Sequence, residues 1–244
     1  MPGDLGLVAA VAILGLLARF RFITEVFTKG HVIPFGPDSY FHLWRIEETA
    51  RTGLPPRFDP FINAPMGSHV FYPDGFDAVL GWLVRLTAGA HPDRFTVQAI
   101  SMTALPILGA LVVVIAYMIT RRFTQRPGAV VAALLCAILP QHIYLTVFGR
   151  VDHHIIELGI PLLVVLALVR TLEGQSLRRA GALGALLITG LVYSATGALL
   201  HVFAIIVVVW ATGLREAIRR NIHTATFFSA AAIAAAGSGL LLLP

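Results

Sequence analysis

The chain has 244 residues, of which 57% are hydrophobic and 13% are charged, and its formal net charge is +5 at pH 7. Soluble domains have about 25% charged residues, so this composition excludes an ordinary soluble protein and predicts one that crosses a membrane several times. The basic residues stand in short clusters between apolar runs, as in membrane-protein loops, which argues against nucleic-acid binding. A single cysteine, Cys136, excludes an internal disulfide and a cysteine-based metal site.

Seven apolar runs are long enough to predict membrane spans, which need about 17–25 mainly apolar residues. They lie near 5–20, 98–120, 127–147, 155–170, 180–194, 196–214 and 222–243. The first run lacks a basic leader and a clear cleavage site, so we interpret it as a retained span. The run 180–214 is divided in two, because one helix of that length would extend about 52 Å, well beyond a hydrocarbon core of roughly 30 Å.

Arginine clusters predict how these spans are oriented. Three loops between spans carry them: Arg121, Arg122 and Arg126; Arg170, Arg178 and Arg179; Arg215, Arg219 and Arg220. Because positive loops stay on the cytoplasmic side, we expect the N-terminus inside, and the loop 21–96 and the turn 148–154 outside. Arg19, Arg21 and Lys29 count against this orientation.

The long loop 21–96 contains an apolar stretch, 76–89, that is too short to cross a membrane. We expect an interfacial or re-entrant helix there, packed on the outer surface. The alternative, a short true span, would invert every downstream loop and place the arginine clusters outside.

The same loop contains an acidic, histidine-bearing segment, "PDSYFHLWRIEE", residues 37–48. Pro37 cannot continue a preceding helix, and Asp38 is predicted as the N-cap of a new one. His42 follows at i+4 and should share a side of that helix. Arg45 has two open interpretations, a pair with lipid phosphate or with Glu48. Alone, this pattern is also that of a simple capped amphipathic helix.

A second polar segment, "FGRVDHHIIELGIP", begins at the outer end of the fourth predicted span. Its ionisable residues are Asp152, His153, His154 and Glu157. Such groups beside hydrocarbon indicate a functional site, and carboxylates with imidazoles are competent ligands of divalent metals. A helix dipole would explain the acids but not two adjacent histidines. In the predicted topology Asp38 and Asp152 share one membrane face, so they can converge on one cation.

The order and spacing of "GPDSYFHLWRIEE", "FDPFINAPMGSHVFYPDGFD", "RRFTQRP" and "GRVDHHIIE" resemble the N-terminal half of the oligosaccharyltransferase catalytic subunit. That family transfers glycans to Asn in Asn-Xaa-Ser/Thr sequons. It belongs to the membrane-embedded GT-C glycosyltransferases, which use polyprenyl-linked donors and share a core of seven spans. The resemblance therefore implies an all-α polytopic fold with a long first external loop.

The resemblance also implies site residues. Asp38 matches the acid of the first metal-binding motif, and Asp152 and His154 match the two ligand positions of the second. The metal would be Mn²⁺ or Mg²⁺, which would neutralise the phosphate leaving group. The acceptor Asn would be held near Asp38.

Secondary candidates surround these positions: His42, Arg150, His153 and Glu157. We favour His154 over His153 as the ligand, because adjacent helical residues diverge by about 100°. Glu157 would orient the His154 imidazole or cap the helix. Arg150 would replace the charge of an arginine that some relatives carry at the position of Leu145.

We therefore expect an enzyme of the cell membrane, with its site facing outward, that joins a polyprenyl-linked glycan to an acceptor polypeptide. The C-terminal globular domain of the family, with its Trp-Trp-Asp motif, does not occur in these 244 residues, so we expect them to form a metal-binding portion without full activity. The rival interpretations are another polyprenyl-phosphate-sugar transferase, a cation-coupled transporter and a non-catalytic relative.

Overall fold

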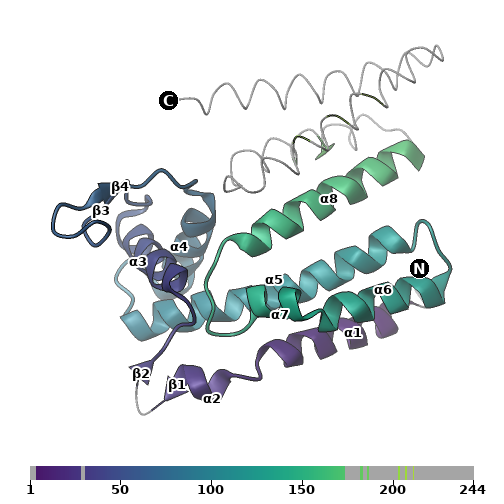
Figure 1. Ribbon diagram of the computed structural model, residues 1–244, viewed down its shortest axis with the longest axis horizontal. Helices are drawn as coiled ribbons and strands as arrows, with labels where there is room; N and C mark the ends of the chain where they lie inside the picture. Colours follow the sequence, from purple (N-terminus) through teal and green to yellow (C-terminus); the bar gives the residue numbers. More distant parts are fainter. Residues whose placement is uncertain are drawn as a thin grey trace. The chain divides into compact units, whose positions relative to one another are not determined.

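The structure is a computed structural model that describes residues 4–28 and 31–173, together with the single positions 182, 183, 186, 203, 207 and 211. The chain divides into two compact units, one formed by Met1–Val113 and Ala133–Ile155, the other by Val114–Ala132 and Ile156–Pro244. The described part is mostly helical (Figure 1). The candidate site residues lie in the first unit, except Glu157.

Two apolar segments among the described residues are long enough to cross a membrane. The first, Leu5–Val26, consists of α1 (Leu5–Arg19) and the short α2 (Ile23–Val26). The second is α5 (Arg94–Thr120), whose 27 residues correspond to about 40 Å of helix. Both coincide with apolar runs that the sequence predicts as spans.

The third predicted span, 127–147, is not one straight helix. It consists of α6 (Arg126–Ile138) and α7 (Pro140–Thr146), which meet at an angle of 55°. The cause is Pro140, which has no N–H to donate and whose ring disfavours helical geometry at the preceding residue. Leu139 accordingly has ψ 119°. The pair is a broken span or a re-entrant segment.

The helix α8 (His154–Glu173) follows, and its apolar stretch His154–Ala167 is shorter than a full span. The predicted spans 180–194, 196–214 and 222–243 lie outside the described residues, apart from the single positions. The total of seven spans therefore stays a prediction, whereas the described part contains two helices, or three with the bent pair, that are long and apolar enough to cross a membrane.

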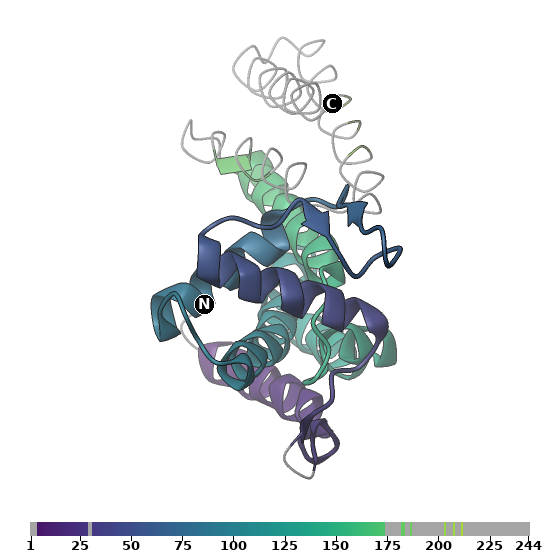
Figure 2. The same ribbon diagram turned by 90° about the vertical axis from the view of Figure 1, so that its left-hand side faces the viewer.

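The loop between the first two spans folds into small elements that gather beside one end of α5 (Figures 1 and 2). Two short antiparallel pairs, β1 (Phe27–Thr28) with β2 (His31–Val32) and β3 (Phe58–Asp59) with β4 (Ser68–His69), flank the helix α3 (Pro37–Thr52) in sequence. The helix α4 (Gly75–Ala88) packs against α3.

Several features hold α3 and α4 together. Ile46, Ala50, Leu80 and Val84 are buried. Gly81 permits close approach, because a Cβ there would lie 2.4 Å from Thr49 Cβ. At the other end, Arg85 Nη1 donates to the carbonyl oxygens of Ala50 and Arg51 at the C-terminus of α3, where a cation also complements the helix dipole.

The opposite face of α4 is apolar and exposed, formed by Val79, Trp82, Leu83 and Leu86. The helix thus has one apolar face toward α3 and a second one that is largely exposed. This is the pattern of a helix at a membrane interface, and its position at the outer surface stays a prediction.

Substituting Gly81 by alanine should loosen the α3–α4 pair, because the added methyl group would overlap Thr49. We expect a loss of about 1–3 kcal/mol, as for other overpacked sites, seen as a lower midpoint in thermal unfolding of the detergent-solubilised protein. Gly6→Ala is the matched control, since a Cβ at Gly6 meets nothing within 4 Å. Equal midpoints for the two variants would contradict this packing.

Candidate functional site

The start of α3 is bound directly to the loop that carries the second polar motif. Phe35 N–H donates to the Gly149 carbonyl oxygen at 2.8 Å, and Val151 N–H donates to Ser39 Oγ at 3.0 Å. The Ser39 hydroxyl in turn donates to the Phe35 carbonyl oxygen at 2.6 Å. The two motifs, more than 100 residues apart in sequence, therefore lie side by side, as the predicted convergence of the segments carrying Asp38 and Asp152 requires.

Gly149 makes this contact possible. Its φ is +98°, and a Cβ there would lie 2.4 Å from Val26 Cγ2 and 3.1 Å from the Phe35 ring. A residue with a side chain would meet both the strained backbone conformation and these neighbours. Gly149 and Ser39 were not identified from the sequence, since neither residue type signals a long-range contact.

Asp152 is fully buried at the centre of this loop. Its Oδ2 accepts a hydrogen bond from Arg150 Nη2 at 2.7 Å, while Oδ1 makes no hydrogen bond and lies 3.2 Å from His153 Nδ1. Burial acts to raise the pKa of Asp152, but the hydrogen bond from Arg150 and the positive charge of the neighbouring histidines and Arg150 outweigh it, so the net pKa is lowered. Asp152 is therefore a carboxylate with one oxygen available to a ligand.

Arg150 is held from two sides. Its guanidinium lies 4.5 Å from the centre of the Tyr144 ring and pairs with Asp152. Burial acts to lower the pKa of Arg150, whereas the hydrogen bond to Asp152 and the charge of that carboxylate prevail and raise it. The Arg150 side chain is thus held in a position where it pairs with the Asp152 carboxylate.

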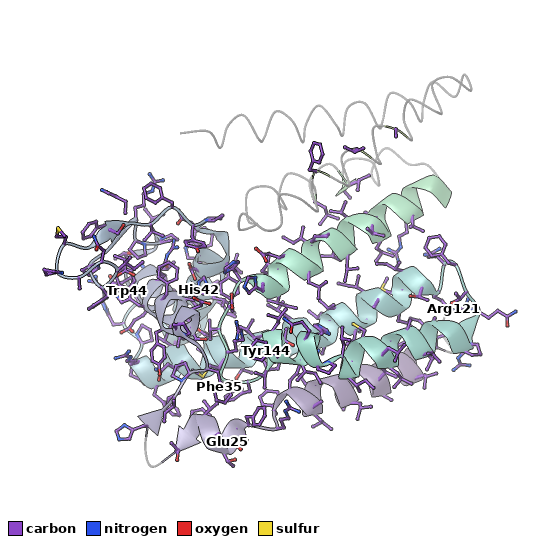
Figure 3. The ribbon with its side chains drawn as sticks, viewed as in Figure 1. Glu25, Phe35, His42, Trp44, Arg121 and Tyr144 are labelled. Carbon is purple, nitrogen blue, oxygen red and sulfur yellow. The ribbon has the colours of Figure 1, made fainter. Side chains whose placement is uncertain are left out.

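His42 connects the site to α4. Its Nδ1 donates to Asp77 Oδ1 at 2.7 Å, and its Nε2 lies 3.1 Å from His153 Nδ1. Both His42 and Asp77 are buried. Figure 3 shows His42 on the side of α3 nearer to Tyr144, with Trp44 on the other side of the helix.

Arg45 extends this network and corrects the interpretation that it pairs with Glu48. It is fully buried, with Nη2 2.5 Å from Asp74 Oδ1 and Nε 3.2 Å from Asp77 Oδ2. Its partners are thus Asp74 and Asp77 and not Glu48, which instead accepts a hydrogen bond from Arg51; a pair with lipid phosphate stays a prediction. Asp74 and Asp77 were missed in the sequence because acids at the start of a helix are common there.

Asp38 differs from its predicted role as N-cap. The N-cap is Gly36, with φ 80°, and Asp38 is the second residue of α3 and is exposed. Although His42 is only one turn away, it is buried, so the two side chains have different environments. A role of Asp38 as a metal ligand stays a prediction.

The ligand atoms of His42, Asp152 and His153 lie within 4.8 Å of one another. A set of one carboxylate and two imidazoles fits a divalent transition metal. This set contains His153, whereas the sequence favours His154; the choice of His154 as the ligand stays a prediction. The helix α8 begins only at His154, so the helical divergence of about 100° does not separate the two rings, whose centres lie 4.6 Å apart.

His154 lies close by, with Nε2 3.8 Å from Asp152 Oδ2. Glu157 belongs to the second unit, so its part in the site stays a prediction. The structure therefore brings together Asp152, Arg150, His42 and His153, with His154 at the edge.

Comparison with curated proteins shows related archaeal enzymes. The chain is 30% identical over 166 residues to "Dolichyl-phosphooligosaccharide-protein glycotransferase 1" of Archaeoglobus fulgidus, covering 67% of this chain and 27% of that protein. It is 25% identical over 154 residues to "Dolichyl-monophosphooligosaccharide--protein glycotransferase AglB" of Haloferax volcanii, covering 61% of this chain and 14% of that protein. The chain thus spans about a quarter or less of the length of these relatives.

Solved structures show the same fold. One is the oligosaccharyltransferase of Archaeoglobus fulgidus in complex with Zn and sulfate, with a TM-score of 0.74 and 21% identity, covering 97% of this chain and 30% of that chain. Another is AglB from the same organism with an inhibitory peptide and a dolichol-phosphate, with a TM-score of 0.71, 21% identity and coverage of 98% and 29%. The model of the family "Oligosaccharyl transferase STT3, N-terminal" matches residues 7–242. Because this match extends over nearly the whole sequence, the chain belongs to that oligosaccharyl transferase family.

Proposed function

We propose that this chain is the N-terminal, metal-binding portion of an enzyme that transfers a glycan from a polyprenyl-(di)phosphate donor to Asn of Asn-Xaa-Ser/Thr sequons. Its relatives are named dolichyl-phosphooligosaccharide-protein glycotransferases, and one structural neighbour is a complex with a dolichol-phosphate and an inhibitory peptide. The observation that carries the proposal is the convergence of the α3 start with the buried Asp152 loop.

The metal would be Mn²⁺ or Mg²⁺, held by Asp152 with imidazoles of His42, His153 or His154, and by Asp38. When bound, it would supply Lewis-acid stabilisation of the phosphate leaving group. The imidazoles of His42 and His153, each with a nitrogen within 4.8 Å of an Asp152 carboxylate oxygen, favour Mn²⁺, since Mg²⁺ prefers an all-oxygen site.

The residues around the ligands orient them. Arg150 occupies Oδ2 of Asp152 and so leaves Oδ1 for the metal. Asp77 accepts from His42 Nδ1, which places the lone pair of neutral His42 on Nε2, the nitrogen that faces His153. This carboxylate–histidine pairing is the usual way in which proteins fix the tautomer of a ligand histidine.

We further propose that the site faces the external side of the cell membrane, in a core of seven spans. The arginine clusters support this orientation. Arg19, which counts against this orientation in the sequence, is the last residue of α1 and is buried, so it does not act as a positive charge in a loop.

Asp152→Asn in the full-length protein should reduce Mn²⁺-dependent glycan transfer to a sequon peptide by about 10²–10³-fold, as for other lost electrostatic groups. Asparagine keeps the shape but removes the anionic ligand. The assay follows the mobility shift of a fluorescent peptide at saturating lipid-linked donor. Glu48→Gln, which removes a surface pair with Arg51, is the control and should retain activity. Full activity of Asp152→Asn would overturn the metal-site proposal.

Asp77→Asn should raise the Mn²⁺ concentration for half-maximal transfer by about 10–100-fold, the usual effect of losing a carboxylate behind a ligand histidine. The matched control is Asp74→Asn, which affects Arg45 but does not contact His42. Mn²⁺ titrations of both variants at a fixed peptide concentration provide the measurement. An equal shift in the two would mean that Asp77 acts through Arg45 instead.

A further inference from the structure

Arg19 is a buried cation that the proposed mechanism does not use. It is the last residue of α1, within the apolar segment Leu5–Val26, and its side chain is fully buried. A charged side chain at such a place is costly and indicates a function.

The guanidinium joins α1 to both halves of the broken helix α6–α7. Its Nη1 donates to the carbonyl oxygen of Ala137 at 3.3 Å, near the C-terminus of α6. Its Nε donates to Thr146 Oγ1 at 2.7 Å, and its Nη2 lies 2.9 Å from His142 Nδ1, both on α7. A break in an apolar helix leaves carbonyl groups that need partners, and Arg19 supplies a donor at this one.

The neighbouring helices are shaped around this side chain. A Cβ at Gly109 on α5 would lie 2.4 Å from Arg19 Nε and 2.9 Å from Thr146 Cβ. A Cβ at Gly15 on α1 would lie 3.3 Å from Arg19 Nη1. The absence of a side chain at Gly109 and Gly15 therefore leaves the space that the Arg19 guanidinium occupies.

The main chain of Arg19 continues the connection toward the site. Its carbonyl oxygen accepts from Phe148 N–H at 2.8 Å, two residues after the end of α7 and four residues before Asp152. Arg19 thus contacts α7 through its side chain and Phe148 through its backbone. The loop it precedes is the one that binds Ser39 through Val151.

We propose that Arg19 is a positioning residue, which locks the outer half of the broken helix and so holds the 147–152 loop against α3 with Asp152 in place. The catalytic consequence rests on the proposed function, whereas the position of the loop does not. The two parts can be tested separately.

The structural test is hydrogen–deuterium exchange of the full-length protein in nanodiscs, comparing Arg19→Met with the wild type. We expect amide exchange in residues 147–153 to accelerate at least tenfold, with α3 residues 43–52 and α4 unchanged. Thr146→Val, which removes one partner of Arg19, should show a smaller effect in the same segment. Arg21→Met is the control, because Arg21 is exposed and stacks on the neighbouring Phe22 ring.

Unchanged exchange at 147–153, or acceleration that extends equally through α3 and α4, would overturn the proposal. If Arg19→Met does not fold, Thr146→Val decides by the same criterion. The functional test is the Mn²⁺ titration of glycan transfer: half-saturation should shift about tenfold for Arg19→Met, with the KM for the peptide unchanged. Absence of transfer by the wild type would overturn the proposed function while the exchange result still stood.

Discussion

The hydrogen bonds between the first turn of α3 and the loop before α8 are the constraint on which the site depends. Phe35 binds Gly149, and Val151 binds Ser39, so the backbone that carries Asp152 is aligned with the helix that carries His42. Buried main-chain groups must find partners. Here the partner of each segment is the other one, which fixes their register without any contribution from the charged side chains.

The ionisable side chains around these hydrogen bonds are arranged in a series of pairs. Arg150 neutralises Asp152, His42 pairs with Asp77, and Arg45 lies between Asp77 and Asp74. Removing Arg150 or His42 would leave the buried carboxylate of Asp152 or Asp77 with one partner fewer, which costs more than the pair is stabilising. This explains why α4, which supplies no proposed ligand, is packed so closely on α3 through Gly81.

Buried polar groups also need partners at the break between α6 and α7. The chain breaks a span at Pro140, close to the polar loop, and the break exposes backbone groups where water is scarce. Arg19 Nη1 donates to the Ala137 carbonyl oxygen, and His142 Nδ1 lies 2.9 Å from the Cys136 carbonyl oxygen, so side chains from two different helices meet that need. The irregular segment is therefore held firmly, although it lacks continuous helical hydrogen bonds.

The sequence by itself determined the apolar helices α1 and α5, the polar segments around Asp38 and Asp152, and the family that those segments resemble. These are local properties, since composition and periodicity are written in consecutive residues. The tertiary structure decided which polar groups meet: His153 with His42, Arg45 with Asp74, Arg19 with a broken helix, and Ser39 with Val151. Such pairings join residues that are mostly far apart in the chain, and they follow from how the helices pack, which no spacing within one segment can specify.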